Sequence, residues 1–138
     1  MECFNIKHHN IVSDRREIHD ILKSIHSIFD KNSNIDETLQ FIATVKNKNT
    51  IIDLSFDETD IVQTLLSLNI EDYSETLLDN RDSDPPKLYV FGKTIQNMEV
   101  YIKFKIKETQ NKMIICVSFH YSEHTMNYPY RNGKGRSI

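Results

Sequence analysis

The sequence predicts an α+β domain in which helices pack on one face of a small antiparallel β-sheet. Two segments, near residues 15–30 and 57–68, carry apolar residues at helical spacing. Residues 87–121 instead show strand patterns joined by short connections, which predicts a meander of three to four strands. At 138 residues and 16.3 kDa, the chain is long enough for one domain with a single core.

The first 34 residues predict a helical extension. Ser13 or Asp14 suits the helix N-cap, and Asp14 with Glu17 three residues later resembles a capping box. The helix is expected to run to about residue 30 on an apolar stripe made by Ile18, Ile21, Leu22, Ile25, Ile28 and Phe29. We expect residues 1–12 to be a loose or packed-on terminus. No further ligand at metal spacing accompanies the histidines of this region, which are expected to face solvent: His8, His9, His19 and His26.

The middle of the chain has a less regular pattern. Residues 39–45 start like a helix, yet their β-branched content favours a strand, the interpretation that we prefer. Residues 46–49 indicate a turn, and residues 50–54 either a helical turn or a short strand. Ser55 with Glu58 predicts a capping box for the second helix. Its core residues are expected to be Ile61, Val62, Leu65, Leu66 and Leu68, and the following Tyr73 is expected to be buried against the sheet.

Residues 79–86 form a polar loop closed by two prolines. Its aspartates lack the glycine and distal glutamate of a calcium loop, so we expect a lid or a plain connection. Residues 88–95 then form a strand with three aromatic or aliphatic side chains inward, Tyr89, Phe91 and Ile95. A turn at residues 96–97 places Gly92 opposite Tyr101, where the missing side chain is expected to leave open space on the sheet face.

Residues 100–107 and 113–119 predict a hairpin with one buried face and one basic face. With residues 110 and 111 as its turn, and Thr109 facing Lys112, the expected pairs are Ile106–Ile115, Phe104–Val117, Ile102–Phe119, Lys103–Ser118 and Tyr101–His120. This register collects the apolar side chains on one face. It also sets a phenol and an imidazole side by side on an exposed face rich in lysine.

The net charge of −3 hides an asymmetry between two parts of the chain. From Pro86 onward nine Lys and Arg residues stand against three Glu, a balance of +6, whereas residues 1–85 carry −9. The basic part coincides with the predicted sheet and favours an anionic partner there, although lysines on an exposed strand also serve simply to prevent aggregation. No apolar run approaches a membrane span and no signal-peptide start is present, so we expect a cytoplasmic protein. Cys3 and Cys116 fit no metal spacing, and Cys116 is expected to be a buried, reduced thiol.

The side chains predicted to gather on the basic face suit metal-independent RNA cleavage. The chain has no nucleotide-binding glycine loop, no HExxH motif and no nucleophile elbow, and we expect neither a cofactor nor a metal. Cleavage by 2′-hydroxyl attack needs a base, an acid for the leaving 5′-oxygen and cations for the phosphate. His120 is expected to be the acid or base, Tyr101 a proton donor or base-positioning group, and Lys103 a phosphate ligand. A plain cross-strand contact between Tyr101 and His120 remains the alternative.

Further RNA contacts are expected from the neighbouring strand and from the segment after residue 121. Lys93 and Arg131 are suited to hold phosphate, Arg in a bidentate way. Tyr128 and Tyr130 are suited to stack on splayed bases, and His124 adds another polar contact. We expect residues 132–138 to be a disordered tail.

Several short motifs, in order, resemble the MqsR-type toxins of bacterial toxin–antitoxin modules. They occur at residues 71–75 (EDYSE), 89–93 (YVFGK), 99–103 (EVYIK), 117–120 (VSFH) and 126–130 (MNYPY). The resemblance covers residues 35–131, which would form the toxin-like core of the single domain. It implies a RelE-like fold, ribosome-independent cleavage of mRNA, and neutralisation by a cognate MqsA-type antitoxin that covers the toxin.

The resemblance carries some of the family's active-site residues to this chain. The tyrosine and lysine of the family's Val-Tyr-x-Lys strand fall on Tyr101 and Lys103, and a family lysine is replaced by His120. Another family lysine corresponds to Ser74, and the family's active-site glutamine corresponds to Leu88. We therefore expect a toxin that cuts single-stranded mRNA. The alternatives are a non-catalytic RelE-like module, binding RNA or a protein through its basic face, and a structural subunit whose face is only solvated.

Overall fold

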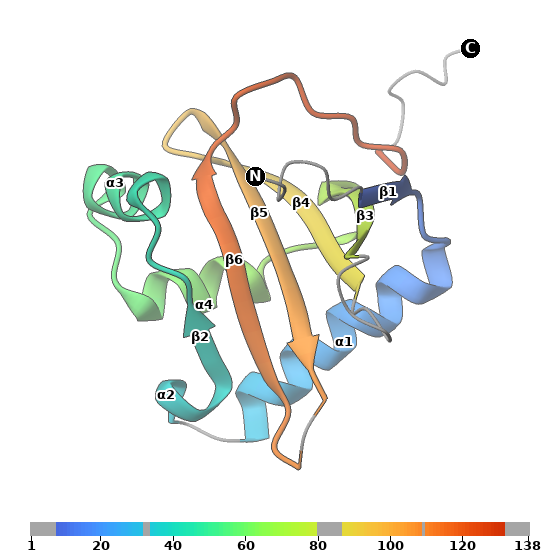
Figure 1. Ribbon diagram of the computed structural model, residues 1–138, viewed down its shortest axis with the longest axis horizontal. Helices are drawn as coiled ribbons and strands as arrows, with labels where there is room; N and C mark the ends of the chain where they lie inside the picture. The colour runs from blue at the N-terminus through green and yellow to red at the C-terminus, as the bar shows by residue number, and fades with distance from the viewer. Residues whose placement is uncertain (1–7, 32–33, 80–86, 109, 132–138) are drawn as a thin grey trace.

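We describe a computed structural model of the chain over residues 8–31, 34–79, 87–108 and 110–131. Over these residues the chain forms a six-stranded sheet in the order β1-β3-β4-β5-β6-β2 (Figure 1). The strands are β1 (His8–Ile11), β2 (Leu39–Phe41), β3 (Tyr73–Asp79), β4 (Lys87–Ile95), β5 (Met98–Lys107) and β6 (Met113–Tyr121). The helices are α1 (Arg15–Lys31), α2 (Ile35–Thr38), α3 (Val45–Leu54) and α4 (Glu58–Leu66), with a 3-10 turn η2 (Ile70–Asp72).

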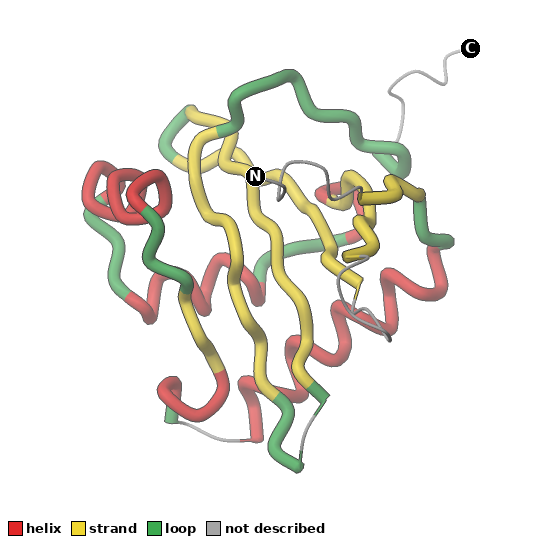
Figure 2. The backbone as a smooth tube through the Cα atoms, viewed as in Figure 1, coloured by secondary structure: helices red, strands yellow, loops and turns green. Residues whose placement is uncertain are grey.

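Helices α1 and α4 cover one face of the sheet, and the tube in Figure 2 shows both passing behind the strands. Their apolar stripes meet the inward side chains of the central strands in one core. The members exposed by no more than 1% include Ile18, Ile25, Ile61, Leu65, Phe91, Phe104 and Phe119. The prediction of an α+β domain with helices on one face is confirmed. In the described residues, no helix is both long and apolar enough to span a bilayer.

The sheet is larger than the predicted meander. Strands β3 to β6 follow one another antiparallel, β1 adds to β3 antiparallel, and β2 adds to β6 in parallel. Residues 8–11 pair with β3 as an edge strand, so of the two alternatives for residues 1–12 the packed-on terminus is confirmed there and the loose one is wrong. Tyr73, predicted to be buried, is fully buried as the first residue of β3. The predictions for residues 1–7, for the loop at 80–86 and for the tail at 132–138 lie outside the described residues.

Helix α1 begins as predicted. The Asp14 side chain accepts a hydrogen bond of 2.9 Å from the Glu17 backbone N–H. The Glu17 carboxylate, in turn, reaches across to β4 and accepts hydrogen bonds from Lys87 Nζ at 2.8 Å and from the Tyr89 hydroxyl at 2.7 Å. His19 and His26 are exposed on α1, as expected from their place off the apolar stripe.

Replacing Glu17 with glutamine is expected to lower the free energy of unfolding by about 1–2 kcal/mol at neutral pH, since two charge-assisted bonds are weakened at a partly exposed site. Burial alone would raise the pKa of Glu17, but the hydrogen bonds from Lys87 and Tyr89 and the Lys87 charge lower it overall. This stabilisation is present above the ordinary carboxyl pKa and is lost as the pH falls through the lower pKa of the folded protein. Urea unfolding of both proteins at pH 7 and pH 3 measures the effect. A difference equally large at pH 3 would contradict it.

Helix α3 lies where the sequence predicted a turn at residues 46–49, and that prediction is wrong. The Thr44 side chain caps the helix by accepting from the Asn47 N–H at 3.2 Å. The Lys-Asn-Lys-Asn sequence hides the helix because its buried face includes the polar residues Asn47 and Thr50. The preferred strand over residues 39–45 is confirmed only for Leu39–Phe41.

Helix α4 is found as predicted, but its cap is not Ser55. Asp57 caps α4, and Asp57 and Asp60 exchange side chain to backbone hydrogen bonds of 3.0 and 2.9 Å. Ser55 instead ends α3 in the left-handed conformation, with φ of 60°. The predicted capping box at Ser55 and Glu58 therefore covers two features, the end of α3 and the start of α4, which three residues separate.

The hairpin of β5 and β6 follows the predicted register along half its length. The confirmed pairs are Tyr101–His120, Ile102–Phe119 and Lys103–Ser118. A bulge next to Lys103 then shifts the pairing by one residue, so the remaining pairs are Phe104–Cys116, Lys105–Ile115, Ile106–Ile114 and Lys107–Met113. The predicted partners of Phe104 and Ile106, Val117 and Ile115, are wrong.

The bulge allows β6 to bury residues at both even-numbered and odd-numbered positions. Side chains alternate along a regular strand, so residues 116 and 119 would face opposite sides of the sheet. The extra residue, Val117, lets both Cys116 and Phe119 enter the core, where neither is exposed. Cys116 is the buried thiol that was expected, and burial raises its pKa to about 12. The predicted two-residue turn is also wrong, because the strands end at Lys107 and Met113; Thr109 is outside the described residues.

Candidate functional site

Tyr101 and His120 stack on the sheet face opposite α1 and α4. They are cross-strand partners on β5 and β6, with ring centroids 5.3 Å apart and planes inclined by 15°. Gly92 of β4 lies on the other side of Tyr101 in the same row. Both rings are half-buried, so each presents one part to solvent. The predicted pairing of a phenol with an imidazole on this face is confirmed.

The backbone fixes the tautomer of His120. Its Nδ1 lies 3.0 Å from the Tyr121 carbonyl oxygen, which can only accept a hydrogen bond. Nδ1 therefore carries the hydrogen, and in the neutral ring Nε2 keeps its lone pair. This arrangement prepares Nε2 to accept a proton from a bound group.

The environment of Tyr101 favours the protonated phenol. Burial raises the pKa of Tyr101, and the nearby Glu75 carboxylate raises it further. No hydrogen-bond partner holds the Tyr101 hydroxyl within the part of the chain that the structure describes. The phenol is thus suited to donate a hydrogen bond or a proton at neutral pH, and not to act as a base.

Lys103 lies in the next row of the same face, two residues from Tyr101 along β5. That row runs Glu75, Val90, Lys103 and Ser118 across β3 to β6, and Lys103 is half-buried in it. The register thus brings together the three predicted catalytic residues, Tyr101, Lys103 and His120.

Two hollows flank the stacked pair. One, of about 650 Å³, adjoins Tyr101 and is lined by Val12, Ser74, Glu75, Tyr101, Ser122, His124, Thr125, Met126, Asn127, Tyr128 and Pro129. The other, of about 450 Å³, adjoins His120 where α3 begins and is lined by Thr44, Val45, Lys46, Asn47, Val117, Ser118 and His120.

Residues 122–131 form a strap that crosses the end of the sheet from β6 toward β1 (Figure 1). Its Tyr128 sits on Gly92: a Cβ built on that glycine would lie 2.1 Å from the Tyr128 hydroxyl oxygen and 3.0 Å from Met126 Sδ. The expected open space beside Tyr101 at Gly92 is therefore wrong, because the strap fills it. The glycine permits close packing of the strap on the sheet.

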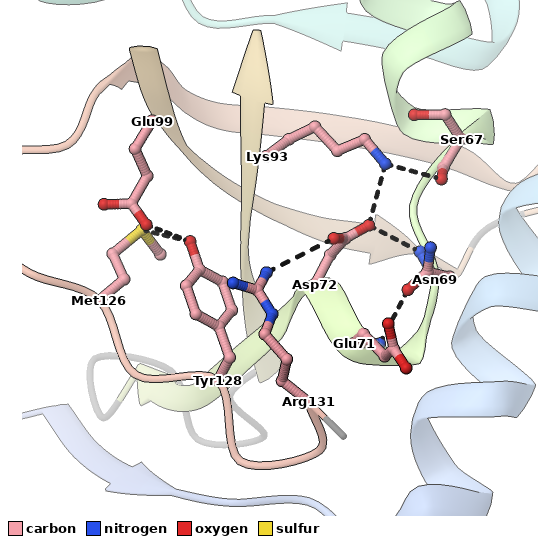
Figure 3. A network of polar contacts seen from close by, with 9 residues as sticks. All are labelled: Ser67, Asn69, Glu71, Asp72, Lys93, Glu99, Met126, Tyr128 and Arg131. Atoms are coloured by element: carbon pink, nitrogen blue, oxygen red, sulfur yellow. Dashed lines mark hydrogen bonds and ion pairs between the residues drawn. The ribbon is translucent and has the colours of Figure 1, made fainter. Parts of the chain in front are cut away.

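The strap is held by the polar network in Figure 3. The Tyr128 hydroxyl donates to Glu99 Oε2 at 2.5 Å, and the Arg131 guanidinium lies 3.8 Å from the centre of the Tyr128 ring. Arg131 also lies 3.9 Å from Asp72 Oδ1. Burial raises the pKa of Tyr128, and its hydrogen bond to Glu99 raises it further, so this donor stays protonated.

Of the five predicted RNA contacts, only His124 and Tyr128 border the hollow beside Tyr101. Lys93 points to the helical side, where its Nζ lies 3.1 Å from Asp72 Oδ2 and donates to the Ser67 carbonyl at 3.2 Å (Figure 3). The Arg131 guanidinium lies 3.9 Å from the other carboxylate oxygen of the same Asp72. Tyr130 stacks on Tyr73 at 5.9 Å and donates to the Ser13 carbonyl at 2.6 Å. The structure does not bring Lys93, Arg131 or Tyr130 to the stacked pair.

Sequence reasoning missed two residues that shape the site. Glu75 borders the hollow beside Tyr101, and only recognition of β3, in which Glu75 and Leu77 share one face, would have placed it there. Asn47, on α3, bonds the backbone of β6 next to His120 and gives no sequence signal because it lies far away along the chain. Among the described residues, no group of three or more His, Cys, Asp and Glu side chains is placed to share a metal ion.

Comparison with known proteins places the chain in a family. The family model of the MqsR toxin, described as motility quorum-sensing regulator, toxin of MqsA, matches residues 14–121. The match runs from the cap of α1 to the end of β6 and includes Tyr101, Lys103 and His120, whereas the strap follows it. No curated protein and no solved structure matches the chain. Since the match covers well over half of the sequence, the chain belongs to the MqsR toxin family.

Proposed function

We propose that this protein is the toxin of a toxin–antitoxin system and an endoribonuclease that cleaves single-stranded mRNA without a metal. The observation that carries the proposal is the stacked Tyr101–His120 pair, with Lys103 one row away on the same face. Membership of the MqsR toxin family supports it. Single-stranded RNA is the expected substrate because a half-buried pair on a sheet face is reached by splayed nucleotides and not by a rigid duplex.

The proposed reaction transfers one proton at each end of the scissile phosphate. His120 Nε2 removes the proton of the 2′-hydroxyl, and the 2′-oxygen attacks phosphorus. The bond from phosphorus to the 5′-oxygen breaks, and Tyr101 gives its phenolic proton to the leaving oxygen. The products are a 2′,3′-cyclic phosphate and a 5′-hydroxyl, and a proton returned to Tyr101 and lost from His120 restores the site.

Lys103 is the cation that we assign to the phosphate. An ammonium group one row from the pair can stabilise the extra negative charge of the pentavalent phosphate. Lys93 and Arg131, which the sequence suggested for this role, are both engaged by Asp72. We therefore assign them to holding the strap and η2 in place.

We propose an MqsA-like antitoxin as the protein partner. The family description names the toxin of MqsA, which is the support for this assignment. An antitoxin that covers the face bearing Tyr101 and His120 would exclude RNA from the site. Antitoxin binding is then expected to protect RNA when the two proteins are mixed before the substrate is added.

Replacing Tyr101 with phenylalanine is expected to abolish growth inhibition when the protein is expressed in bacteria, since the ring stack is kept and only the proton donor is lost. Tyr121→Phe is the matched control, because the Tyr121 hydroxyl binds Asp53 and not the candidate site. Growth curves and the length distribution of total mRNA after induction measure the effect. Arrest by the Tyr101 variant at the wild-type rate would contradict the proposal.

A further inference from the structure

The strap lies outside the family match and lines a hollow together with residues of β3 and β5 that lie inside it. It follows the last matched residue, Tyr121, and closes over the sheet face beside Tyr101. Three separate contacts fix it: Tyr128 to Glu99, Arg131 to Asp72, and the Tyr130 hydroxyl to the Ser13 carbonyl (Figure 3 shows the first two). The strap therefore forms a fixed wall.

The hollow between this wall and the sheet has the size and lining of a small-ligand pocket. Its volume of about 650 Å³ is in the range usual for such pockets. The Tyr101 ring, Met126 and Tyr128 provide flat or apolar surface, and Ser74 and Glu75 of β3 provide polar groups. Further polar side chains of the strap line the hollow: Ser122, His124, Thr125 and Asn127. Flat apolar surfaces with polar groups between them suit a planar heterocycle that stacks and presents its edge.

We infer that this hollow binds the base of a nucleotide next to the scissile phosphate and prefers a base with an exocyclic amino group. The identity of the ligand as a nucleotide of RNA rests on the proposed function. Tyr101 belongs both to the hollow and to the stacked pair, so a base held there places its own phosphate at the reacting groups.

Glu75 provides the discrimination. A carboxylate only accepts hydrogen bonds, and within the described residues no cation or hydrogen-bond donor is paired with it. The amino group at C4 of cytosine or C6 of adenine can donate to it, and that at C2 of guanine can do so in another orientation, whereas uracil presents carbonyl oxygens at both C2 and C4. Uracil is therefore disfavoured by repulsion as well as by a missing hydrogen bond.

The test measures binding of cytidine 3′-monophosphate and uridine 3′-monophosphate by NMR titration of the wild-type protein. Neither ligand has a bond for the enzyme to cleave, so the result is independent of catalysis. The cytidine nucleotide is expected to bind about tenfold more tightly, as a single directed base contact allows, and to shift the Met126 methyl resonance. Equal affinities, no binding of either, or shifts confined to other residues would overturn the inference.

Two variants locate the preference. Glu75→Gln is expected to bring the two affinities to within about twofold, since the amide both donates and accepts, whereas Glu58→Gln, exposed on α4, leaves the preference unchanged. Gly92→Ala is expected to displace Tyr128 and weaken both nucleotides while circular dichroism shows a folded protein. A preference that survives Glu75→Gln overturns the role of Glu75.

Cleavage assays separate this inference from the proposed function. If RNA is cleaved and the mapped cut sites keep the same base preference in Glu75→Gln, the proposed base pocket is rejected and the proposed nuclease activity is retained. If RNA stays intact while cytidine 3′-monophosphate binds with the expected preference, the proposed nuclease activity is rejected and the proposed base pocket is retained.

Discussion

Replacing His120 with alanine is expected to slow RNA cleavage by about two to four orders of magnitude, the usual contribution of a general acid or base. His120 is the group on this face whose free Nε2 can take the 2′-hydroxyl proton, because Nδ1 is bound to the Tyr121 carbonyl. The rate constant for a long single-stranded RNA, measured on gels, reports the effect. His19→Ala is the matched control, since His19 is exposed on α1, on the other side of the sheet.

A second His120 variant distinguishes catalysis from binding. His120→Gln keeps a hydrogen-bonding side chain but cannot carry a proton between groups. We expect His120→Gln to be as inactive as His120→Ala, while both still bind RNA in a salt-dependent way through the lysines. Wild-type cleavage rates in both variants would remove His120 from the mechanism and favour a binding module.

Replacing Asn47 with leucine is expected to lower the free energy of unfolding by about 3 kcal/mol, because three backbone groups lose their hydrogen-bond partner at once, one in a buried and two in part-buried positions. The Asn47 amide donates to the carbonyls of Ile42 at 2.8 Å and Val117 at 2.9 Å, and its oxygen accepts from the Phe119 N–H at 2.9 Å. Asn47 itself is only 1% exposed. Leucine has a similar volume, so the loss comes from hydrogen bonding and not from a cavity.

The position of Asn47 explains why its effect is large. Strand β2 pairs with β6 only as far as Cys116, so among the described residues no strand adjoins that edge of β6 beyond Cys116. The Asn47 side chain continues the ladder across the bulge at Val117 and ends one residue before His120. Asn49→Leu, at an exposed position of the same helix, is the control and is expected to stay within about 0.5 kcal/mol of wild type. Chemical denaturation measures both, and equal stabilities of the two variants would contradict the account.

The strongest local patterns predicted their elements correctly. The apolar stripe of α1, the alternation in β5 and the turn at residues 96–97 each depend on neighbouring residues, and each is found where the pattern placed it. The short edge strands β1 and β2 were missed or only partly found because three or four residues carry little periodicity. Their structure depends on pairing with distant strands.

The candidate site likewise combines a feature that the local sequence predicted with features that it did not. The Tyr101–His120 pair followed from side-chain alternation in one hairpin, so the sequence was sufficient to predict it. Other features depend on contacts between segments far apart in the chain. They are the packing of Tyr128 on Gly92, the ion pair of Lys93 with Asp72 and the bulge at Val117. No local pattern contains that information, and so two of the phosphate contacts predicted from charge, Lys93 and Arg131, lie at Asp72 and not beside the stacked pair.

The end groups of the cleaved RNA test the central claim most directly. Purified wild-type protein is incubated with a long single-stranded RNA in EDTA, and the fragment termini are identified by mass spectrometry. We predict discrete fragments that end in 2′,3′-cyclic phosphate and begin with 5′-hydroxyl, because the 2′-oxygen is the nucleophile. Intact RNA, or fragments that carry 5′-phosphate, would contradict a metal-independent reaction at Tyr101 and His120.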